Sequence, residues 1–97
     1  MRTTNEYIRL LRDYKSKHAT EYGIERMGIF GSVARGEQTH DSDVDVYIEA
    51  PHMSLFGLAG LSIALEDYLK SPVDIICKHD NMNPYFKQRI EKELIYV

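Results

Sequence analysis

Three aspartates occupy positions from which their carboxylates could hold a metal ion. Asp43 and Asp45 are two residues apart in the alternating segment 43–49, so on a β-strand both side chains would leave the same face, about 7 Å apart. Asp74 lies in a second short apolar segment and completes the group if the two strands are neighbours. Carboxylates held this close repel one another, and hard divalent cations such as Mg²⁺ or Mn²⁺ relieve that repulsion. These residues predict a cation site. The alternatives are a solvated acidic strand face and, for Asp74, a turn or cap residue.

A glycine–serine pair precedes these aspartates and could bind phosphate. Gly31 and Ser32 directly follow a predicted strand. Glycine allows a phosphate to approach the backbone, and the serine hydroxyl and the free N–H groups of a helical turn over 32–35 can hold an anion. The Gly-Lys-Ser/Thr ending of a P-loop is missing from this segment. Arg35 could contact phosphate or neutralise Glu37 or the acidic group. A phosphate-binding turn beside paired carboxylates predicts a site for a metal-bound nucleotide.

Together these segments resemble the signature of the minimal nucleotidyltransferase (MNT) family of the DNA polymerase β-like superfamily. The matching segments are Gly31-Ser32-Val33-Ala34-Arg35-Gly36, Ser42-Asp43-Val44-Asp45-Val46 and Val73-Asp74. Their order and spacing follow that family's pattern, in which a hydrophobic residue precedes Gly-Ser, two alternating aspartates follow after a gap, and a third aspartate lies one strand later. The resemblance extends from the first predicted strand to the last helix.

The resemblance implies a chemistry and a role for each of these residues. Asp43 and Asp45 would bind the metal that accompanies a nucleoside triphosphate, and Asp74 would join them at a second metal and help to deprotonate the attacking hydroxyl. The reaction would be an in-line displacement at the α-phosphate with pyrophosphate leaving, in which two Mg²⁺ ions, or Mn²⁺, stabilise the entering and departing oxygens. The nucleotide-binding residues that the resemblance implies are Gly31, Ser32 and Arg35.

The resemblance also implies a partner. MNT proteins of this kind are commonly paired with HEPN proteins in prokaryotic toxin–antitoxin modules, in which the MNT member is the antitoxin. This implies adenylylation of a HEPN toxin, on a tyrosine hydroxyl and with ATP as donor. A catalytically silent antitoxin that only covers its partner is the alternative, and modification of a small molecule is disfavoured because the chain has no room for an acceptor domain. The acceptor, the base preference and the formation of homo-oligomers stay open.

Six predicted elements position the candidate residues. The first helix begins with a capping box at Thr3 and Glu6 and ends before Gly23, and the last helix begins at Asn83-Pro84. We therefore expect an α/β (α+β) nucleotidyltransferase fold, in which a small mixed sheet is packed by helices. The predicted order is α-β-β-α-β-α, with a helix at 4–22, strands at 24–30 and 43–49, a helix at 54–70, a strand at 73–78 and a helix at 84–95.

Length and composition limit the remaining possibilities. The chain has 97 residues, 43% of them hydrophobic, which favours one domain over 1–97. The absence of a long apolar run and of a secretory leader at Met1 predicts a cytoplasmic protein with no membrane partner. Residues 37–97 carry five Lys/Arg against eleven Asp/Glu, which argues against general nucleic-acid binding. We expect the single cysteine, Cys77, to be a small buried hydrophobe and His40 to be a solvated loop residue.

Overall fold

The first helix begins and ends as its sequence predicts. The computed structural model describes residues 2–97, so Met1 lies outside the described residues. Helix α1 spans Thr4–Tyr22. The Thr3 side chain accepts a hydrogen bond from the Glu6 N–H at 3.2 Å, and the Glu6 carboxylate accepts one from the Thr3 N–H at 3.1 Å. Gly23 adopts a left-handed conformation with φ of 67° and ends the helix, because glycine takes this conformation at little cost.

A four-stranded mixed sheet forms the centre of the molecule. Its strands are β1 (Arg26–Phe30), β2 (Val44–Glu49), β3 (Val73–Cys77) and β4 (Ile95–Tyr96), in the order β3-β2-β1-β4. Strands β1 and β2 are antiparallel, as are β1 and β4, whereas β2 and β3 are parallel. Helix α3 (Leu55–Leu69) makes the crossover connection that a parallel pair requires. A short helix, α2 (Gly31–Arg35), joins β1 to the loop before β2.

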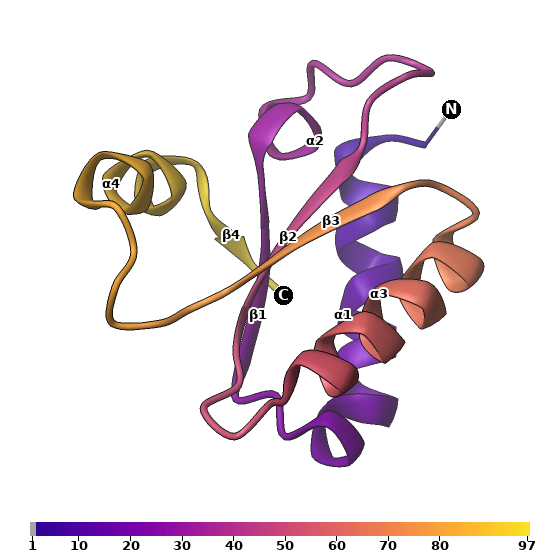
Figure 1. Ribbon diagram of the computed structural model, residues 1–97. Coiled ribbons are helices and arrows are strands. Elements are labelled where there is room, and N and C mark those ends of the chain that lie inside the picture. The colour runs from indigo at the N-terminus through magenta and orange to yellow at the C-terminus, as the bar shows by residue number, and fades with distance from the viewer. Residues whose placement is uncertain (1) are drawn as a thin grey trace.

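The two faces of the sheet are covered differently. Helices α1 and α3 cover one face, and helix α4 (Pro84–Glu93) lies against the other (Figure 1). The larger core lies under α1 and α3 and includes Val44, Val46 and Ile48 of β2. The alternation predicted for this strand is therefore confirmed on its apolar face. The smaller core lies under α4 and consists of Phe30, Tyr47 and Ile90.

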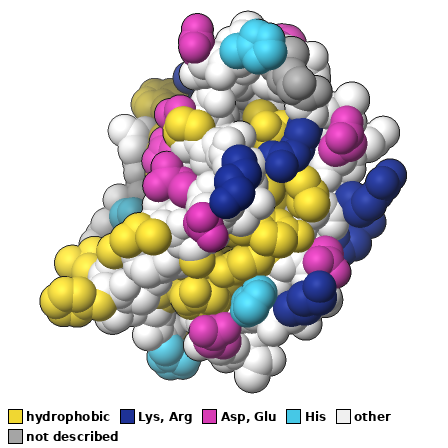
Figure 2. All heavy atoms as spheres, turned by 90° about the vertical axis from the view of Figure 1, so that its right-hand side faces the viewer, with side chains coloured by type: hydrophobic (Ala, Val, Ile, Leu, Met, Phe, Trp, Pro, Cys, Tyr) yellow, Lys and Arg dark blue, Asp and Glu magenta, His cyan; other side chains and the backbone are white. Residues whose placement is uncertain are grey.

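The α1 and α3 side of the molecule carries hydrophobic side chains at its surface. Figure 2 shows them gathered on this side, with charged groups around them. Three large side chains of α3 are exposed: Leu55 at 85%, Phe56 at 92% and Ile63 at 69%. Helix α3 thus buries Leu61, Leu65 and Leu69 against the sheet, while its exposed apolar residues lie in the part up to Ile63. Among the described residues, no helix is long and apolar enough to cross a membrane.

The C-terminal segment differs from its prediction. The helix expected to continue to residue 95 ends at Glu93, and Ile95–Tyr96 form β4 against β1. Leu94 is already extended, so Leu94 packs with the smaller core and Ile95 with the larger one. Gly28 permits this pairing, because a Cβ atom there would lie 2.8 Å from the carbonyl oxygen of Ile95. The predicted order of elements therefore omitted the fourth strand, whereas the mixed α/β architecture is confirmed.

Candidate active site

The glycine–serine turn lies where β1 ends, beside a carboxylate of β2. The last residue of β1, Phe30, pairs directly with Asp45. Gly31 follows with φ of 73°, and a side chain at this position would collide with the Asp45 carboxylate. The glycine is therefore required by its own backbone conformation and by the packing of Asp45 over it. Sequence reasoning had explained Gly31 only by the approach of a phosphate.

The register of the parallel strands brings two of the three aspartates together. Asp45 of β2 is paired with Asp74 of β3, as expected if these strands are neighbours. Asp45 is half-buried and Asp74 is exposed. Both line a cavity of about 330 Å³, together with Gly31 and Ser32. Asp43 is exposed, lies one residue before β2 and does not line this cavity.

The charge of these aspartates is poorly compensated. Burial raises the pKa of Asp45 above its ordinary value, and the negative charges of Asp74 and Asp43 raise it further, while Arg35 lowers it. Within residues 2–97, no lysine, arginine or histidine forms an ion pair with any of the three. Carboxylates with this much unbalanced charge favour a cation.

The donor set suits a hard divalent cation, although it is not assembled as a three-ligand centre. Among the residues that the structure describes, no three acidic, histidine or cysteine side chains are arranged to hold a metal ion. Asp45 and Asp74 lie across from one another in the sheet, and Asp43 precedes them in the same strand region. Carboxylate oxygens are the ligands that Mg²⁺ and Mn²⁺ prefer. The residues present therefore fit such an ion in their chemistry.

Arg35 lies at the cavity but is engaged by two glutamates. Its guanidinium forms ion pairs with Glu37 at 3.2 Å and with Glu93 at 2.7 Å. Glu93 also accepts a hydrogen bond from the backbone N–H of Gly31 at 3.0 Å. The structure thus places Arg35 beside the predicted phosphate-binding turn and confirms the alternative pairing with Glu37. The pairing with Glu93 was not expected from the sequence.

One wall of the cavity comes from α4, and sequence reasoning missed it. Phe86, Arg89 and Glu93 line the cavity beside the buried Ile90. Helical spacing places these residues on one side of α4, and the sequence alone could have predicted this. The sequence could not predict that α4 lies over the second face of the sheet, because only the tertiary fold brings this helix to Gly31.

Two other residues considered from the sequence lie elsewhere. His40 is exposed and lies at a different depression, with Tyr7 and Lys70. Cys77 is half-buried and packs against the larger core, on the face of β3 opposite to that of Asp74. Neither contributes to the cavity at Asp45.

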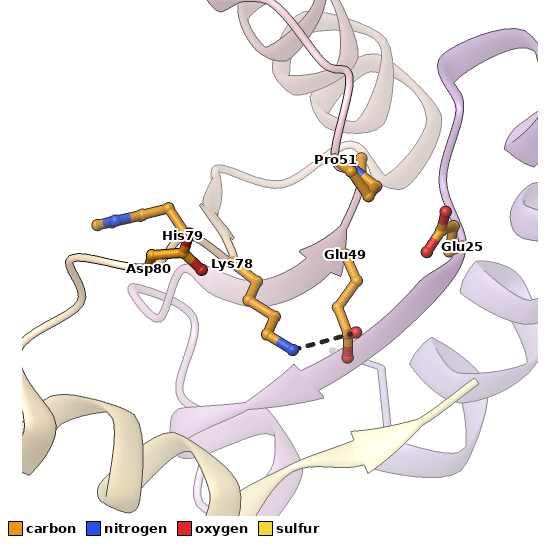
Figure 3. Close-up of a pocket in the computed structure, with 7 residues that line it drawn as sticks. Glu25, Glu49, Pro51, Lys78, His79 and Asp80 are labelled. Carbon is orange, nitrogen blue, oxygen red and sulfur yellow. Dashed lines mark ion pairs between the residues drawn. The ribbon is translucent and has the colours of Figure 1, made fainter.

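A second cavity, of about 410 Å³, lies at the other end of β2. Figure 3 shows Glu25, Glu49, Lys78 and His79 around it. Glu49 is paired there with Lys78 at 3.7 Å and with Arg26 at 3.9 Å. Cations of the protein thus accompany Glu49, whereas none forms an ion pair with Asp43, Asp45 or Asp74 among the described residues.

The sheet topology and the site together define a class of enzyme. A mixed sheet carries paired aspartates on adjacent strands, beside a glycine–serine turn at the end of a third strand, which is the arrangement of a nucleotidyltransferase. The chain matches the family described as "Nucleotidyltransferase domain" over residues 8–97. It belongs to this family.

Several relatives cover the whole chain. It is 41% identical over 98 residues to a protein of Methanocaldococcus jannaschii named "Putative protein adenylyltransferase", with 100% of both chains covered. It is 31% identical over 98 residues to "Protein adenylyltransferase MntA" of Thermococcus cleftensis, covering 100% of this chain and 98% of the relative. These similarities support its assignment as a nucleotidyltransferase enzyme.

Solved structures support the same fold. One, described as "Structure of putative minimal nucleotidyltransferase", has a TM-score of 0.80 and 32% identity and covers 97% of this chain and 95% of its own. Another, of a "tri-AMPylated Shewanella oneidensis HEPN toxin in complex with MNT antitoxin", has a TM-score of 0.61 and 20% identity and covers 96% of this chain and 66% of its own. At that identity, the second likeness concerns the fold alone.

Proposed function

We propose that residues 1–97 act as one nucleotidyltransferase domain that transfers AMP from ATP to a hydroxyl group of a protein partner, in a metal-dependent reaction. The observation that carries this proposal is the pairing of Asp45 with Asp74 in the same cavity as Gly31 and Ser32. The groups that we propose to bind triphosphate and metal thereby lie within one small cavity.

Each residue has a role in this proposal. Asp43 and Asp45 hold the metal that accompanies the triphosphate, and Asp74 shares in holding a second one. The backbone at Gly31 and the hydroxyl of Ser32 bind the outer phosphates. Two Mg²⁺ ions, or Mn²⁺, would supply charge stabilisation at the entering and departing oxygens. Arg35 assists in holding the phosphates.

The bond changes are those of an in-line displacement. The acceptor oxygen bonds to the α-phosphorus while the bond from that phosphorus to the bridging oxygen breaks, and pyrophosphate leaves. Asp74 takes up the proton of the acceptor hydroxyl, because it is the exposed member of the aspartate pair and is accessible to an acceptor.

The proposed partner is a HEPN toxin, modified on a tyrosine hydroxyl, and this chain is its antitoxin. The names of the adenylyltransferase relatives support AMP transfer to a protein. The structure of an MNT antitoxin with an AMPylated HEPN toxin supports this class of partner, since the two MNT folds are alike. A HEPN protein encoded beside this chain would be the partner to test.

Label transfer from α-³²P-ATP to that HEPN protein tests the proposal. Asp45→Asn and Asp74→Asn keep the shape of each side chain and remove one negative charge, so both variants should bind the partner in a pull-down yet transfer no label. Asp41→Asn is the matched control, because Asp41 is exposed, lies in the preceding loop and does not line the cavity. Mass spectrometry of the labelled partner identifies the acceptor residue.

Protection of cells from the partner separates catalysis from masking. If transfer is the mechanism, Asp45→Asn and Asp74→Asn should fail to protect cells that wild type protects. If both variants protect as well as wild type, this chain neutralises its partner by contact, and the catalytic proposal is wrong while the fold assignment stands.

A further inference from the structure

Glu93 occupies the donors that the triphosphate would use. Its carboxylate accepts the Gly31 N–H at 3.0 Å through one oxygen and the Arg35 guanidinium at 2.7 Å through the other. The side chain of Glu93 is only 20% exposed, so these contacts hold it inside the cavity. Its partners lie 62 and 58 residues earlier in the chain, so the contact is created by the fold.

A carboxylate and a phosphate compete for such donors. Both are anions that accept charge-assisted hydrogen bonds from guanidinium and backbone N–H groups. The carboxylate of Glu93 also adds negative charge beside Asp45, where a triphosphate brings more. The triphosphate and Glu93 therefore cannot both use Gly31 and Arg35 fully.

We infer that Glu93 is an affinity-determining residue of the nucleotide site, an internal anion that a triphosphate must displace from Gly31 and Arg35. This inference rests on the proposed function. It assigns a role to a residue of α4 that does not itself take part in the transfer.

The fold allows this displacement without movement of the helix. Ile90, one turn before Glu93, is 2% exposed and anchors α4 in the smaller core, and β4 fixes the chain directly after Leu94. Displacement is therefore a rotation of the Glu93 side chain. Arg89 lies four residues before Glu93, at helical spacing on the same cavity, and offers a cation to the displaced carboxylate.

Calorimetric titration with Mg²⁺ and α,β-methylene ATP, an analogue that cannot transfer AMP, tests the inference. Glu93→Gln removes the competing charge while keeping the shape of the side chain. The dissociation constant of the analogue from this variant should therefore be about tenfold lower than from wild type, which is the effect of losing one charged hydrogen-bond competitor. Glu91→Gln is the matched control, because it removes the same charge from an exposed position of the same helix outside the cavity. Its affinity should equal that of wild type.

The outcomes separate this inference from the proposed function. The inference about Glu93 is supported if only Glu93→Gln binds the ATP analogue more tightly than wild type. This includes the case in which wild type does not bind the analogue measurably. Equal or weaker binding by Glu93→Gln, with wild type binding, overturns the inference and leaves the proposed function intact. If none of the three proteins binds the analogue, both the inference and the proposed function are wrong. Thermal melts confirm that the variants are folded.

Discussion

At the scale of single residues, Asp45 is the residue of the candidate site whose negative charge costs the folded protein free energy. This carboxylate is half-buried, lies across from Asp74 and packs over the backbone of Gly31. A charge in such surroundings costs free energy in the folded protein, and a bound cation would offset that cost. Asp45 therefore lowers the stability of the metal-free protein, as residues of functional sites often do, and this cost fits the metal binding that we propose for it.

The first prediction concerns this cost. The pKa of Asp45 is raised by burial and by Asp74, so the folded protein binds a proton at this group more tightly than the unfolded chain does. Ionisation of Asp45 therefore lowers the free energy of unfolding at neutral pH, and this penalty fades as the pH falls through the raised pKa. Without divalent metal, Asp45→Asn should melt a few degrees above wild type at pH 7, and the difference should vanish in acid.

Thermal melts across a pH series, in buffer with EDTA, measure this effect. Asp41→Asn provides the comparison, because it removes the same charge from an exposed side chain in the loop before β2. A lower melting temperature for Asp45→Asn than for wild type at neutral pH would mean that the carboxylate stabilises the fold, contrary to our account.

The second prediction concerns Gly31. Gly31→Ala should lower the free energy of unfolding by about 1–2 kcal/mol from the left-handed backbone alone, and the collision with Asp45 should add to this. Gly60→Ala is the control, since it lies within α3 with open space around it and should raise stability by about 0.5–1 kcal/mol. Urea unfolding of both variants makes the comparison, and a Gly31→Ala protein as stable as wild type would remove the packing argument.

At the scale of elements, the site depends on how strands and helices meet. The parallel pairing of β2 and β3 places Asp45 against Asp74, and the antiparallel pairing of β1 and β2 places Gly31 beside Asp45. Helix α4 closes the site from the second face of the sheet. The site is thus a product of pairing register, with one wall supplied by the packing of a single helix.

A third prediction tests the attachment of that wall. Ile90 is 2% exposed and shares the smaller core with Phe30 and Tyr47. Ile90→Ala should lower the free energy of unfolding by about 2–4 kcal/mol through a cavity and a lost apolar contact. Glu91→Ala, at the exposed neighbouring position, should change it by less than about 0.5 kcal/mol. Chemical denaturation measures both, and a cost below about 1 kcal/mol for Ile90→Ala would show that α4 is not held by this residue.

Much of this arrangement was predictable from the sequence, for reasons visible in particular elements. The capping box at Thr3 and Glu6 and the alternation of β2 are local signals, and both are confirmed. The sequence predicted that Asp74 lies beside Asp45 only if their two strands are neighbours, because strand register depends on tertiary contacts. Strand β4 is too short to have a periodicity, so the predicted helix was extended through it.

The contribution of Glu93 shows a different limit. Its residue type and helical spacing gave no reason to connect it to a glycine 62 residues away. The contact arises because α4 crosses the face of the sheet that carries Asp45 and Asp74. Long-range placement of a helix is not encoded in any local pattern, so this part of the site required the structure.

At the scale of the whole molecule, the proposed function is confined to one end of a small sheet. The cavity at Asp45 lies at the start of β2, and the cavity at Glu49 lies at its other end, where Lys78 pairs with Glu49. The cavity at Asp45 is small, at about 330 Å³. The proposed partner therefore supplies the acceptor and part of the recognition.

The central claim is that Asp45 belongs to a site for a metal-bound nucleotide, and a thermal melt with Mg²⁺ and ATP tests it most directly. A ligand that binds only the folded state raises the melting temperature by mass action. Wild type should be stabilised by millimolar Mg²⁺ and ATP together, more than by Mg²⁺ alone or by ATP with EDTA. Asp45→Asn, although folded, should lose most of that joint shift. No shift in wild type, or an equal shift in Asp45→Asn, would contradict the account.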